Sequence, residues 1–321
     1  MDPQLADWLL DSDPALRWQV ERDLLGASLE IWEATRARVS QEGIAAQLLA
    51  LQDPDGQWDG GSYFPKGFDF ATVESDGQPW TATTWSLNSL REWGVDAASL
   101  GDTSERLEKN SRWDYNNLPY WDDEVDCCIN AYTLANGTWL GRDMSQLASW
   151  FVEHQMEEGG WNCEWVEGST RSSFHSTLNS LLGILEYEIR VGGYSELTRA
   201  RHRAEEYLLH RHLMYRNSSG EDVSNWVSNF CYPERWKYSA LRAAEYFRRA
   251  SLLDQKMPDS RIGKAIDLIR ESGQSDGRYV QGRTYPGKIW FEVDAPEGQA
   301  SRWITLFAHR VLIWWDSFER A

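Results

Sequence analysis

The residues with the clearest chemical potential lie in the stretch 121–132, which reads WDDEVDCCINAY. Asp126 and Cys128 stand two residues apart there, at what the pattern predicts to be the start of a helix. A second stretch of the same kind, STRSSFHSTLNSLLGIL, carries His175. Aspartate, cysteine and histidine form a zinc ligand set that leaves a fourth position open to water or substrate. We therefore predict a Zn²⁺ site on Asp126, Cys128 and His175, if the fold brings His175 alongside.

Each of these residues also has an ordinary structural explanation. Asp126 is a suitable helix N-cap, Cys128 a small buried residue, and His175 a hydrogen-bonded residue of an inner wall. Cys163, in the loop GGWNCEW, is a fourth ligand, a nucleophile or a packing residue. Cys127 is expected to point away from Cys128, because neighbouring positions on a helix diverge by about 100°.

The elements that must position these residues recur as a unit of two helices. Each unit has a helix, a turn with Gly and Trp, an irregular segment, and a second helix that opens with small polar residues. The segments SLNSL (86–90) and TLNSL (177–181) are nearly identical, and 239–241 and 304–306 match them more weakly. A period of roughly 45–65 residues with two helices per unit predicts an array of about six helical hairpins.

The two ends of the chain predict that this array closes on itself. An open array needs polar terminal repeats, but both terminal segments are apolar and rich in tryptophan: Trp8, Trp18, Trp314 and Trp315. We therefore expect an all-α fold, an (α/α)6-type toroid that forms a closed ring. Residues 1–42 would supply N-terminal helices and residues 43–318 the repeats. No Pro/Ser-rich linker interrupts residues 1–321, which predicts one domain.

The N-terminal helices have recognisable boundaries. Asp13 followed by Pro14 is a typical helix start, with Asp as the cap and Pro at the first helical position. A second helix is expected from Leu29 through Leu51, before the turn formers of LQDPDGQWDGG.

Composition narrows the partners and the compartment. The 321 residues carry a formal net charge of −18, which argues against nucleic acid and anionic membranes as partners. No apolar run reaches the roughly 20 residues of a membrane span, and the acidic N-terminus is no signal peptide. Four cysteines, two of them adjacent, are no disulfide framework. We expect a cytoplasmic protein with reduced thiols that acts on a small-molecule substrate.

The turns with Gln, Gly and Trp carry a family resemblance over about residues 43 to 318. They comprise Gln52, Gly56 and Trp58, then Gln155, Gly159, Gly160 and Trp161. In these turns, and in the small residues that begin the following helices, the chain resembles the α/α-toroid superfamily of squalene-hopene cyclases and protein prenyltransferase β-subunits. The resemblance implies an active site inside the ring, at the starts of the inner helices.

The prenyltransferase branch is the closer in its motifs. Its zinc site has Asp-x-Cys at an inner-helix start and a His before Thr on the next inner helix, matched here by Asp126, Cys128 and His175. The positions that match His175 in the other units are Thr84, Tyr238 and Trp303, so only one unit supplies a histidine. The resemblance implies a zinc-dependent transferase, cyclase or hydrolase.

Two alternatives stay open. The Asp-x-Asp-Asp motif of class II cyclases aligns with residues 124–127, which implies a metal-free acid catalyst that uses Asp126 with Glu124. In the other alternative the protein is no enzyme but a ligand-binding toroid whose zinc is structural. A closed four-ligand site that includes Cys163 would favour this second alternative.

The substrate is expected to be small, apolar or aromatic, and compatible with a cationic group. Candidate binding residues are the acidic pair Asp122 and Asp123, the cation Arg171, and the aromatic residues Trp161, Trp165, Phe174, Trp236, Tyr238 and Trp303. About half of these aromatic rings are expected to plug turns instead.

The protein is not expected to bind prenyl diphosphates usefully. Prenyltransferases bind diphosphate with basic residues just before the Asp-x-Cys motif, and the matching positions here are Tyr120 and Asp123. Most other arginines fall on predicted outer helices, where they would not converge on a cavity. Arg171, Arg235 and Arg302, near inner-helix starts, are the exceptions.

Overall fold

The computed structural model describes residues 1–319, and in this range the protein is mostly helical, which confirms the all-α class. One short antiparallel strand pair, β1 (Tyr279–Val280) and β2 (Ala300–Ser301), is present. The α-helices are, in chain order, α1 (Pro3–Leu10), α2 (Pro14–Asp23), α3 (Leu29–Arg38), α4 (Gly43–Ala50), α5 (Val73–Asp76), α6 (Thr83–Trp93), α7 (Thr103–Asn110), α8 (Cys127–Trp139), α9 (Ser145–Glu153), α10 (Phe174–Val191), α11 (Ser195–Leu209), α12 (Ala240–Asp254), α13 (Gly263–Glu271) and α14 (Arg302–Glu319).

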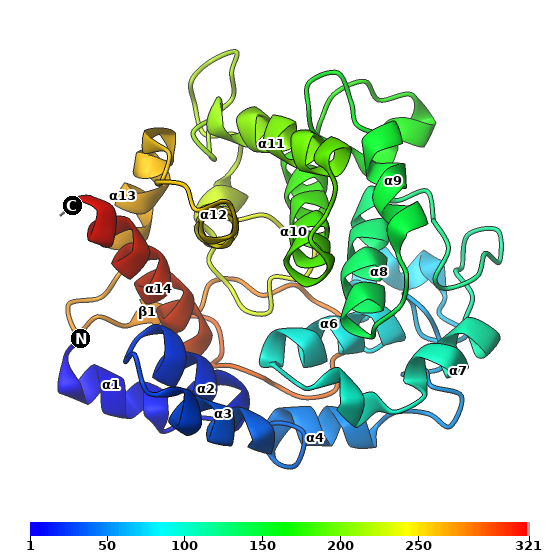
Figure 1. The fold of residues 1–321 in the computed structure, drawn as a ribbon, viewed down its shortest axis with the longest axis horizontal. Helices are drawn as coiled ribbons and strands as arrows, with labels where there is room; N and C mark the ends of the chain where they lie inside the picture. Colours follow the sequence, from blue (N-terminus) through cyan, green and yellow to red (C-terminus); the bar gives the residue numbers. More distant parts are fainter. Residues whose placement is uncertain (320–321) are drawn as a thin grey trace.

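The helices follow one another around the middle of the molecule, as Figure 1 shows. We call α2, α6, α8, α10, α12 and α14 the inner helices. Along the chain each packs against the next from α6 to α14, and α14 packs against α2. The indole Nε1 of Trp18 on α2 donates to the Trp93 carbonyl at the end of α6, 2.8 Å away. Because α14 packs against α2, helices from the two ends of the chain are neighbours.

The predicted helix start at Asp13 is confirmed, but the long helix after it is not. The Asp13 carboxylate accepts from the Ala15 N–H, and α2 begins at Pro14. The predicted helix from Leu29 to Leu51 is two helices, α3 and α4. They separate at Gly43, which has φ of +74° and lies so close to the Asp13 carboxylate that a Cβ would overlap it. The same carboxylate accepts from the Ile44 N–H at 2.8 Å, so it caps α4 as well.

The turns with Gln, Gly and Trp have the same hydrogen bonds in both units. The Gln52 side chain donates to the Gly56 carbonyl, and Gln155 donates to Gly159. The Trp58 indole donates to a carbonyl of α4 at 2.8 Å, and the Trp161 indole donates to a carbonyl of α9 at 3.0 Å. Both indoles are fully buried. The turns are therefore true structural repeats in which each Trp anchors its turn to the preceding helix.

The turns also align the inner helices, and they correct one sequence alignment. The Trp161 N–H donates to Thr177 Oγ1, and the Trp58 N–H donates to Thr83 Oγ1, both at 3.1 Å. Thr83 is therefore the counterpart of Thr177, which makes Thr81 and not Thr84 the position that matches His175. When the two helices are aligned on Thr83 and Thr177, the SLNSL segment begins three residues, or about one helical turn, later in its helix than the TLNSL segment does.

Loss of such an anchor is expected to weaken the fold. Thr177→Val keeps the shape of the side chain but leaves the buried Trp161 N–H without its acceptor, so we expect unfolding to require about 1–3 kcal/mol less free energy. Urea denaturation would measure this loss. The control is Thr133→Val on α8, since Thr133 bonds only to the carbonyl of Ile129 in its own helix. Equal effects of the two substitutions would contradict this role for Thr177.

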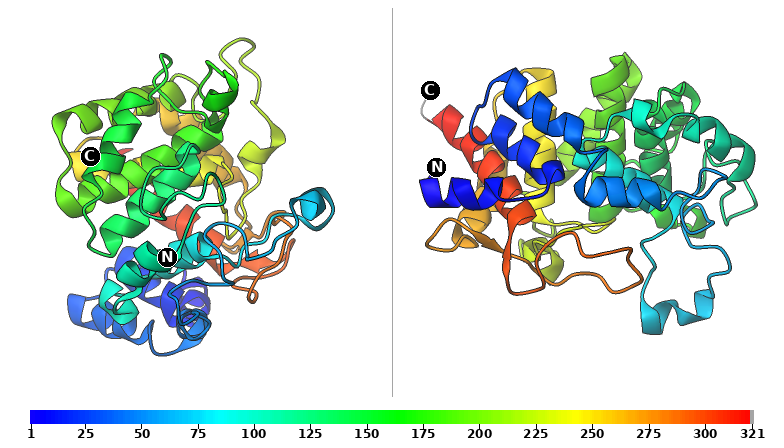
Figure 2. Two further views of the ribbon diagram at one scale, coloured as in Figure 1. Left: turned by 90° about the vertical axis from the view of Figure 1, so that its right-hand side faces the viewer. Right: turned by 90° about the horizontal axis from the view of Figure 1, so that it is seen from below.

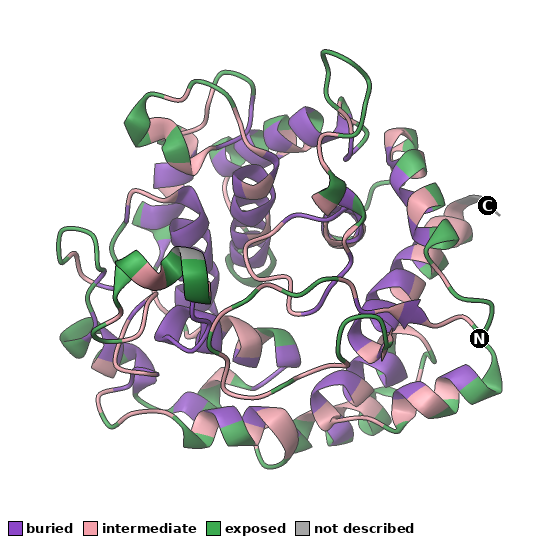
Figure 3. Ribbon diagram, turned by 180° about the vertical axis from the view of Figure 1, so that it is seen from behind, coloured by how far each residue is buried: buried purple, intermediate pink, exposed green. Residues whose placement is uncertain are grey.

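Buried residues run along the inner helices, whereas the outer helices and loops carry the exposed ones (Figure 3). Every residue of α8 is buried. Two long segments, 59–82 and 279–301, lie together on one side of the molecule (Figure 2), where the Trp80 N–H donates to the Lys288 carbonyl. No helix in the described range is long and apolar enough to span a membrane.

A buried ion cluster joins α10, α11 and α12. Arg201 has 1% of its side chain exposed and contacts three carboxylates: Glu188 at 2.5 Å, Glu205 at 2.6 Å and Asp254 at 2.5 Å. His202 also bonds to Asp254, at 2.8 Å. His202, Glu205 and Asp254 lie close enough together to hold a metal. Because Arg201 already bonds to the carboxylates of Glu205 and Asp254, we interpret the cluster as structural.

Candidate metal centre

The start of α8 is braced by its own loop. The Glu124 N–H donates to Asn130 Oδ1 at 2.8 Å, and the Asn130 amide donates back to the Glu124 carbonyl at 2.6 Å. The Asp126 N–H donates to Glu124 Oε2 at 2.6 Å. Asp126 occupies the N-cap position, but its side chain makes no capping bond. Its carboxylate is therefore available for another partner.

Three thiols meet beside Asp126. Cys163 Sγ lies 3.3 Å from Cys128 Sγ and 3.4 Å from Cys127 Sγ, and all three sulfur atoms are within 4.8 Å of one another. Cys163 comes from a 3₁₀ turn, residues Cys163–Glu167, and lies near the Asp126 carboxyl group. The Ser176 hydroxyl accepts from the Cys163 N–H at 3.2 Å, which ties this turn to α10.

The expectation that Cys127 points away from Cys128 is wrong. Both sulfurs contact Cys163 and lie within 4.8 Å of each other, so the two side chains converge on this residue. Cys127 is 1% exposed. It therefore belongs to the thiol cluster on the side of the core.

His175 lies at the start of α10 in an aromatic environment. The Tyr238 N–H donates to His175 Nδ1 at 2.8 Å, and the ring packs 4.6 Å from the Trp226 ring centroid and 5.6 Å from that of Trp236. Burial, with Lys237 and Arg242 nearby, lowers the pKa of His175 to about 4. The ring is therefore neutral at pH 7, and since Nδ1 is an acceptor, its proton is on Nε2.

Asp126, Cys128 and His175 line one cavity of about 520 Å³, which we call the thiol cavity. Three further residues singled out in the sequence line it too: Glu124, Cys163 and Trp236. The structure therefore brings together the predicted metal ligands and the predicted catalytic residues, although the ligand atoms of Asp126, Cys128 and His175 do not form a compact trio as the three sulfurs do.

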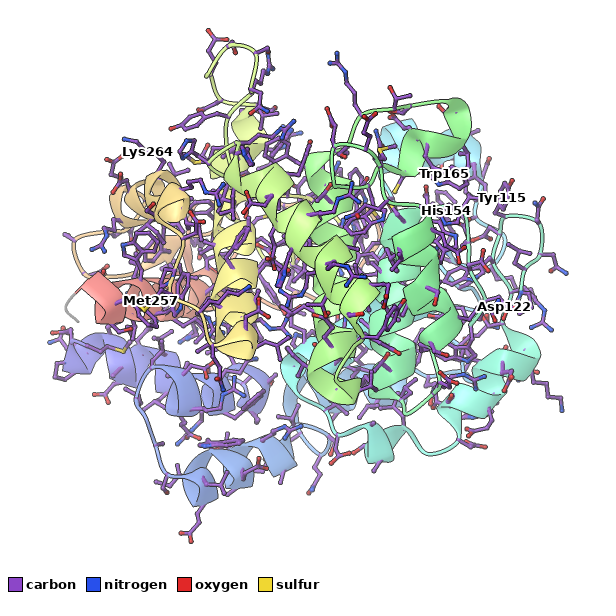
Figure 4. The ribbon with its side chains drawn as sticks, turned by 45° about the horizontal axis from the view of Figure 1, so that its top comes forward. Tyr115, Asp122, His154, Trp165, Met257 and Lys264 are labelled. Carbon is purple, nitrogen blue, oxygen red and sulfur yellow. The ribbon has the colours of Figure 1, made fainter. Side chains whose placement is uncertain are left out.

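The other predicted substrate-binding residues do not line the thiol cavity. Trp161 is a buried turn anchor, and Trp165 packs edge-on against His154 (Figure 4) while its indole donates to the Val125 carbonyl. Asp122, at the periphery in Figure 4, is exposed. The remaining residues divide between exposed loop positions, Asp123 and Arg171, and the buried core, Phe174, Tyr238 and Trp303. The pattern of aromatic residues alone does not distinguish a ring that plugs a turn from one that faces a cavity.

Sequence reasoning missed a large part of the cavity wall. Tyr63, Phe64 and Gln78 come from the long segment 59–82, and Trp113 and Tyr115 from the loop before α8. Tyr115 lies at the edge of the molecule in Figure 4 and is 46% exposed, which marks the open side of the cavity. The one usable signal was the length of the segment between α4 and α6, since long irregular loops often cover sites.

The carboxyl groups and thiols of the cavity have shifted pKa values. Burial raises the pKa of Glu124 to about 7. Burial, together with the nearby Cys163, raises the pKa of Asp126 to about 7. Hydrogen bonds from Cys127, Cys163 and Asn179 hold the pKa of Cys128 well below its usual value. Cys128 is therefore the thiol that becomes a thiolate most readily, and thiolates are the form of cysteine that binds metals.

The raised pKa values predict a pH dependence for the metal-free protein. Unfolded Asp and Glu titrate at about 3.9 and 4.3, so the native state binds more protons than the unfolded state between about pH 4 and pH 7. Asp126 and Glu124 should therefore lower stability as pH rises through this window, with no further change above about pH 8.

Urea midpoints between pH 4 and pH 8, in a chelator, would measure this effect. Asp126→Asn should flatten the decline with rising pH, whereas the exposed Asp122→Asn should leave it unchanged. Identical slopes for Asp126→Asn and the parent protein would contradict the assigned pKa.

The donor atoms suit zinc. Zinc binds cysteine sulfur, histidine nitrogen and carboxylate oxygen. Cys128 and Cys163 supply two sulfur atoms 3.3 Å apart, and the Asp126 carboxyl group beside Cys163 supplies oxygen, although it lies outside the compact group of sulfur atoms. His175 is differently placed. A histidine that binds zinc through Nε2 normally donates its other N–H to a partner, whereas Nδ1 of His175 accepts the Tyr238 N–H. Ligation through Nε2 would require this hydrogen bond to break.

Comparison of the chain with models of protein families and with curated proteins found no match.

Proposed function

We propose that the thiol cavity is the active site of a zinc-dependent enzyme, with zinc held by Cys128, Cys163 and Asp126. The observation that carries this proposal is that two thiols in contact, Cys128 and Cys163, and the uncapped Asp126 carboxylate line one cavity of about 520 Å³, with the Cys127 thiol next to them on the core side. Two ligands of the predicted set, Asp126 and Cys128, are kept, and Cys163 joins them. His175 remains a ligand candidate only if its ring gives up the Tyr238 N–H.

Zinc in such a site can hold a substrate thiol as a thiolate or activate a water molecule. The surrounding side chains have complementary roles. Glu124, with a pKa of about 7, can accept or give a proton at neutral pH. The neutral His175 ring lines the cavity and carries its proton on Nε2, so it can donate a hydrogen bond to a substrate.

The lining of the cavity supports a substrate with an aromatic or apolar body. Tyr63, Phe64, Trp113, Tyr115 and Trp236 surround the space. Four carboxyl groups also line it, Asp114, Glu124, Asp126 and Glu164, and no Lys or Arg among residues 1–319 does. Rings and carboxylates both favour cations, so a substrate with an amine fits better than one with a phosphate. Transfer, cyclisation and hydrolysis all remain compatible with this site.

We also infer that the chain is a closed (α/α)6-type toroid of the cyclase and prenyltransferase superfamily, and that it acts in the cytoplasm. The contacts along the inner helices, and between α14 and α2, support a closed ring. The repeated hydrogen bonds of the Trp58 and Trp161 turns support the repeat on which the resemblance rests. The four free cysteines fit a reducing compartment.

A second candidate function is metal-free acid catalysis by Asp126 with Glu124. The observation that favours it is the pKa of about 7 on both carboxyl groups, since an acid catalyst must keep its proton near neutral pH. The two candidates differ in their need for metal.

Metal analysis of untagged protein, purified with zinc present and then dialysed, tests the proposal. We expect about one zinc per chain. Titration of free thiols in the folded protein gives a second readout, because bound zinc should protect Cys128 and Cys163 from the reagent and a chelator should remove this protection. A metal-free protein that still binds its substrate would favour acid catalysis.

A further inference from the structure

A second cavity, of about 480 Å³, lies between the inner helices and shares no lining residue with the thiol cavity. Nine arginines and four glutamates line it, an excess of five positive charges when all are ionised. This excess is unexpected in a chain whose formal net charge is −18. It also corrects the expectation that the arginines would lie on outer helices and not converge. We call this space the arginine cavity.

The arginines share too few carboxylates. The Glu186 carboxylate forms ion pairs with the guanidinium groups of Arg190, at 2.7 Å, and Arg249, at 2.8 Å. A nitrogen of Arg91 lies 3.8 Å from the same carboxylate. Glu245 likewise receives Arg248 and Arg310, each at 2.8 Å. Five guanidinium groups therefore share two carboxylates of the wall, and among them Arg310 has one further carboxylate partner, Asp23 at 3.3 Å. Guanidinium groups each have five N–H donors in a fixed fork, so many of these donors remain available to a bound anion.

Burial makes the excess charge costly. The side chains of Arg242, Arg248 and Arg310 are only 10–13% exposed. The Nε of Arg310 is buried and has no hydrogen-bond partner. Glu234 partly offsets Arg242, but burial raises the pKa of Glu234 to about 8, so at neutral pH it contributes little negative charge. Buried charges without partners are unfavourable, and an anion in the cavity would remove this cost.

We propose that the arginine cavity binds a small molecule that carries a diphosphate or triphosphate group. Such a group brings several negative charges and many acceptor oxygens, which matches clustered guanidinium groups better than a single carboxylate does. The volume falls within the usual range of small-molecule sites. Trp18 and Trp85 also line the cavity.

This site is separate from the proposed zinc centre but adjacent to it. Asn179 lines the arginine cavity, and its side-chain amide lies 3.4 Å from Cys128 Sγ. Tyr132, also on the wall, donates its hydroxyl proton to Asn179 Oδ1 at 3.2 Å. The proposal rests on the arginines alone and holds whether or not zinc occupies the thiol cavity.

Calorimetric titration of the full-length protein with pyrophosphate and with tripolyphosphate tests the proposal. We expect one site per chain, and affinity that falls as salt rises. Sulfate at equal ionic strength should bind at least about tenfold more weakly, since it offers fewer charges to the arginines. No binding of either probe at millimolar concentration, or equal binding of sulfate, would overturn the proposal.

Variants locate the site. Arg249→Gln should weaken pyrophosphate binding by about tenfold or more, the usual loss when a hydrogen bond between charged groups is removed. Arg249 is 31% exposed, and Arg91 and Arg190 still accompany Glu186, so this variant should fold. The control is Arg199→Gln on α11, an exposed arginine outside the cavity that also pairs with a glutamate. Equal binding by the two variants would place the anion elsewhere and overturn the proposal.

Two further outcomes distinguish a binding site from a structural ion network and from zinc. Glu186→Gln removes the competing carboxylate and should tighten pyrophosphate binding severalfold, whereas a purely structural network would show no such gain. Pyrophosphate can also bind metal, so the titration is repeated after chelation. Binding that persists supports the arginine cavity, and binding that disappears assigns the anion to the metal and contradicts the proposal.

Discussion

Replacement of Arg201 by methionine is expected to lower the free energy of unfolding by about 3–5 kcal/mol, the usual cost of removing one partner from a buried ion cluster. Arg201 is 1% exposed and bonds to carboxylates of Glu188, Glu205 and Asp254. Methionine fills similar space but leaves the buried Glu188 and the partly buried Glu205 and Asp254 without their shared cation. Of the neighbouring basic side chains, Lys256 pairs with Asp254 but with neither of the other two acids, and His202 likewise contacts only Asp254 of the three.

Urea denaturation of Arg201→Met would measure this effect. Arg199→Met is the matched control, since Arg199 lies two residues earlier on α11, is 66% exposed and pairs only with Glu196. Exposed pairs of this kind contribute about 0–1 kcal/mol. If both variants lose the same small amount of stability, the cluster does not hold α10, α11 and α12 together.

Cys128→Ala and Cys163→Ala are each expected to weaken zinc binding by at least about 100-fold, because even residues that only orient a ligand cost 10–100-fold when lost. Helix content should stay unchanged, since apolar contacts hold the inner helices together. Zinc affinity measured by competition with a chelator, with circular dichroism as the check on folding, tests both expectations.

The other cysteines are the controls for this prediction. Cys231→Ala removes a buried thiol outside the thiol cavity and should not change zinc affinity. Cys127→Ala should have a smaller effect than Cys128→Ala, because Cys127 does not line the cavity. If Cys127 proves as important as its neighbours, the thiols form a closed structural site, and the enzyme proposal loses its open metal position.

The helical repeat and the proximity of Asp126 to His175 could be predicted from the sequence, because both depend on local patterns. The Trp58 and Trp161 turns have Gln, Gly and Trp at the same spacing. The acidic run before Asp126 is typical of the segment that precedes a helix, so the sequence places Asp126 at a helix start. His175 begins another inner helix, so a repeat alone places it near Asp126. These inferences need no knowledge of individual contacts.

Contacts between distant residues were not predictable in the same way. The tautomer of His175 depends on the Tyr238 N–H, 63 residues away. The break between α3 and α4 depends on the Asp13 carboxylate, 31 residues before Ile44. The arginine cavity was missed because arginines on α6, α10, α12 and α14 reach one space only when those helices are packed together. Amphipathic patterns place charged residues outside by default.

X-ray absorption at the zinc edge of the metal-loaded protein tests the central claim most directly. If Cys128, Cys163 and Asp126 hold zinc, the spectrum should show two sulfur neighbours at about 2.3 Å together with nitrogen or oxygen neighbours at about 2.0–2.2 Å. The Cys163→Ala protein should show one sulfur neighbour fewer if it binds zinc at all. A first shell without sulfur, or one made only of sulfur, would contradict the proposed centre.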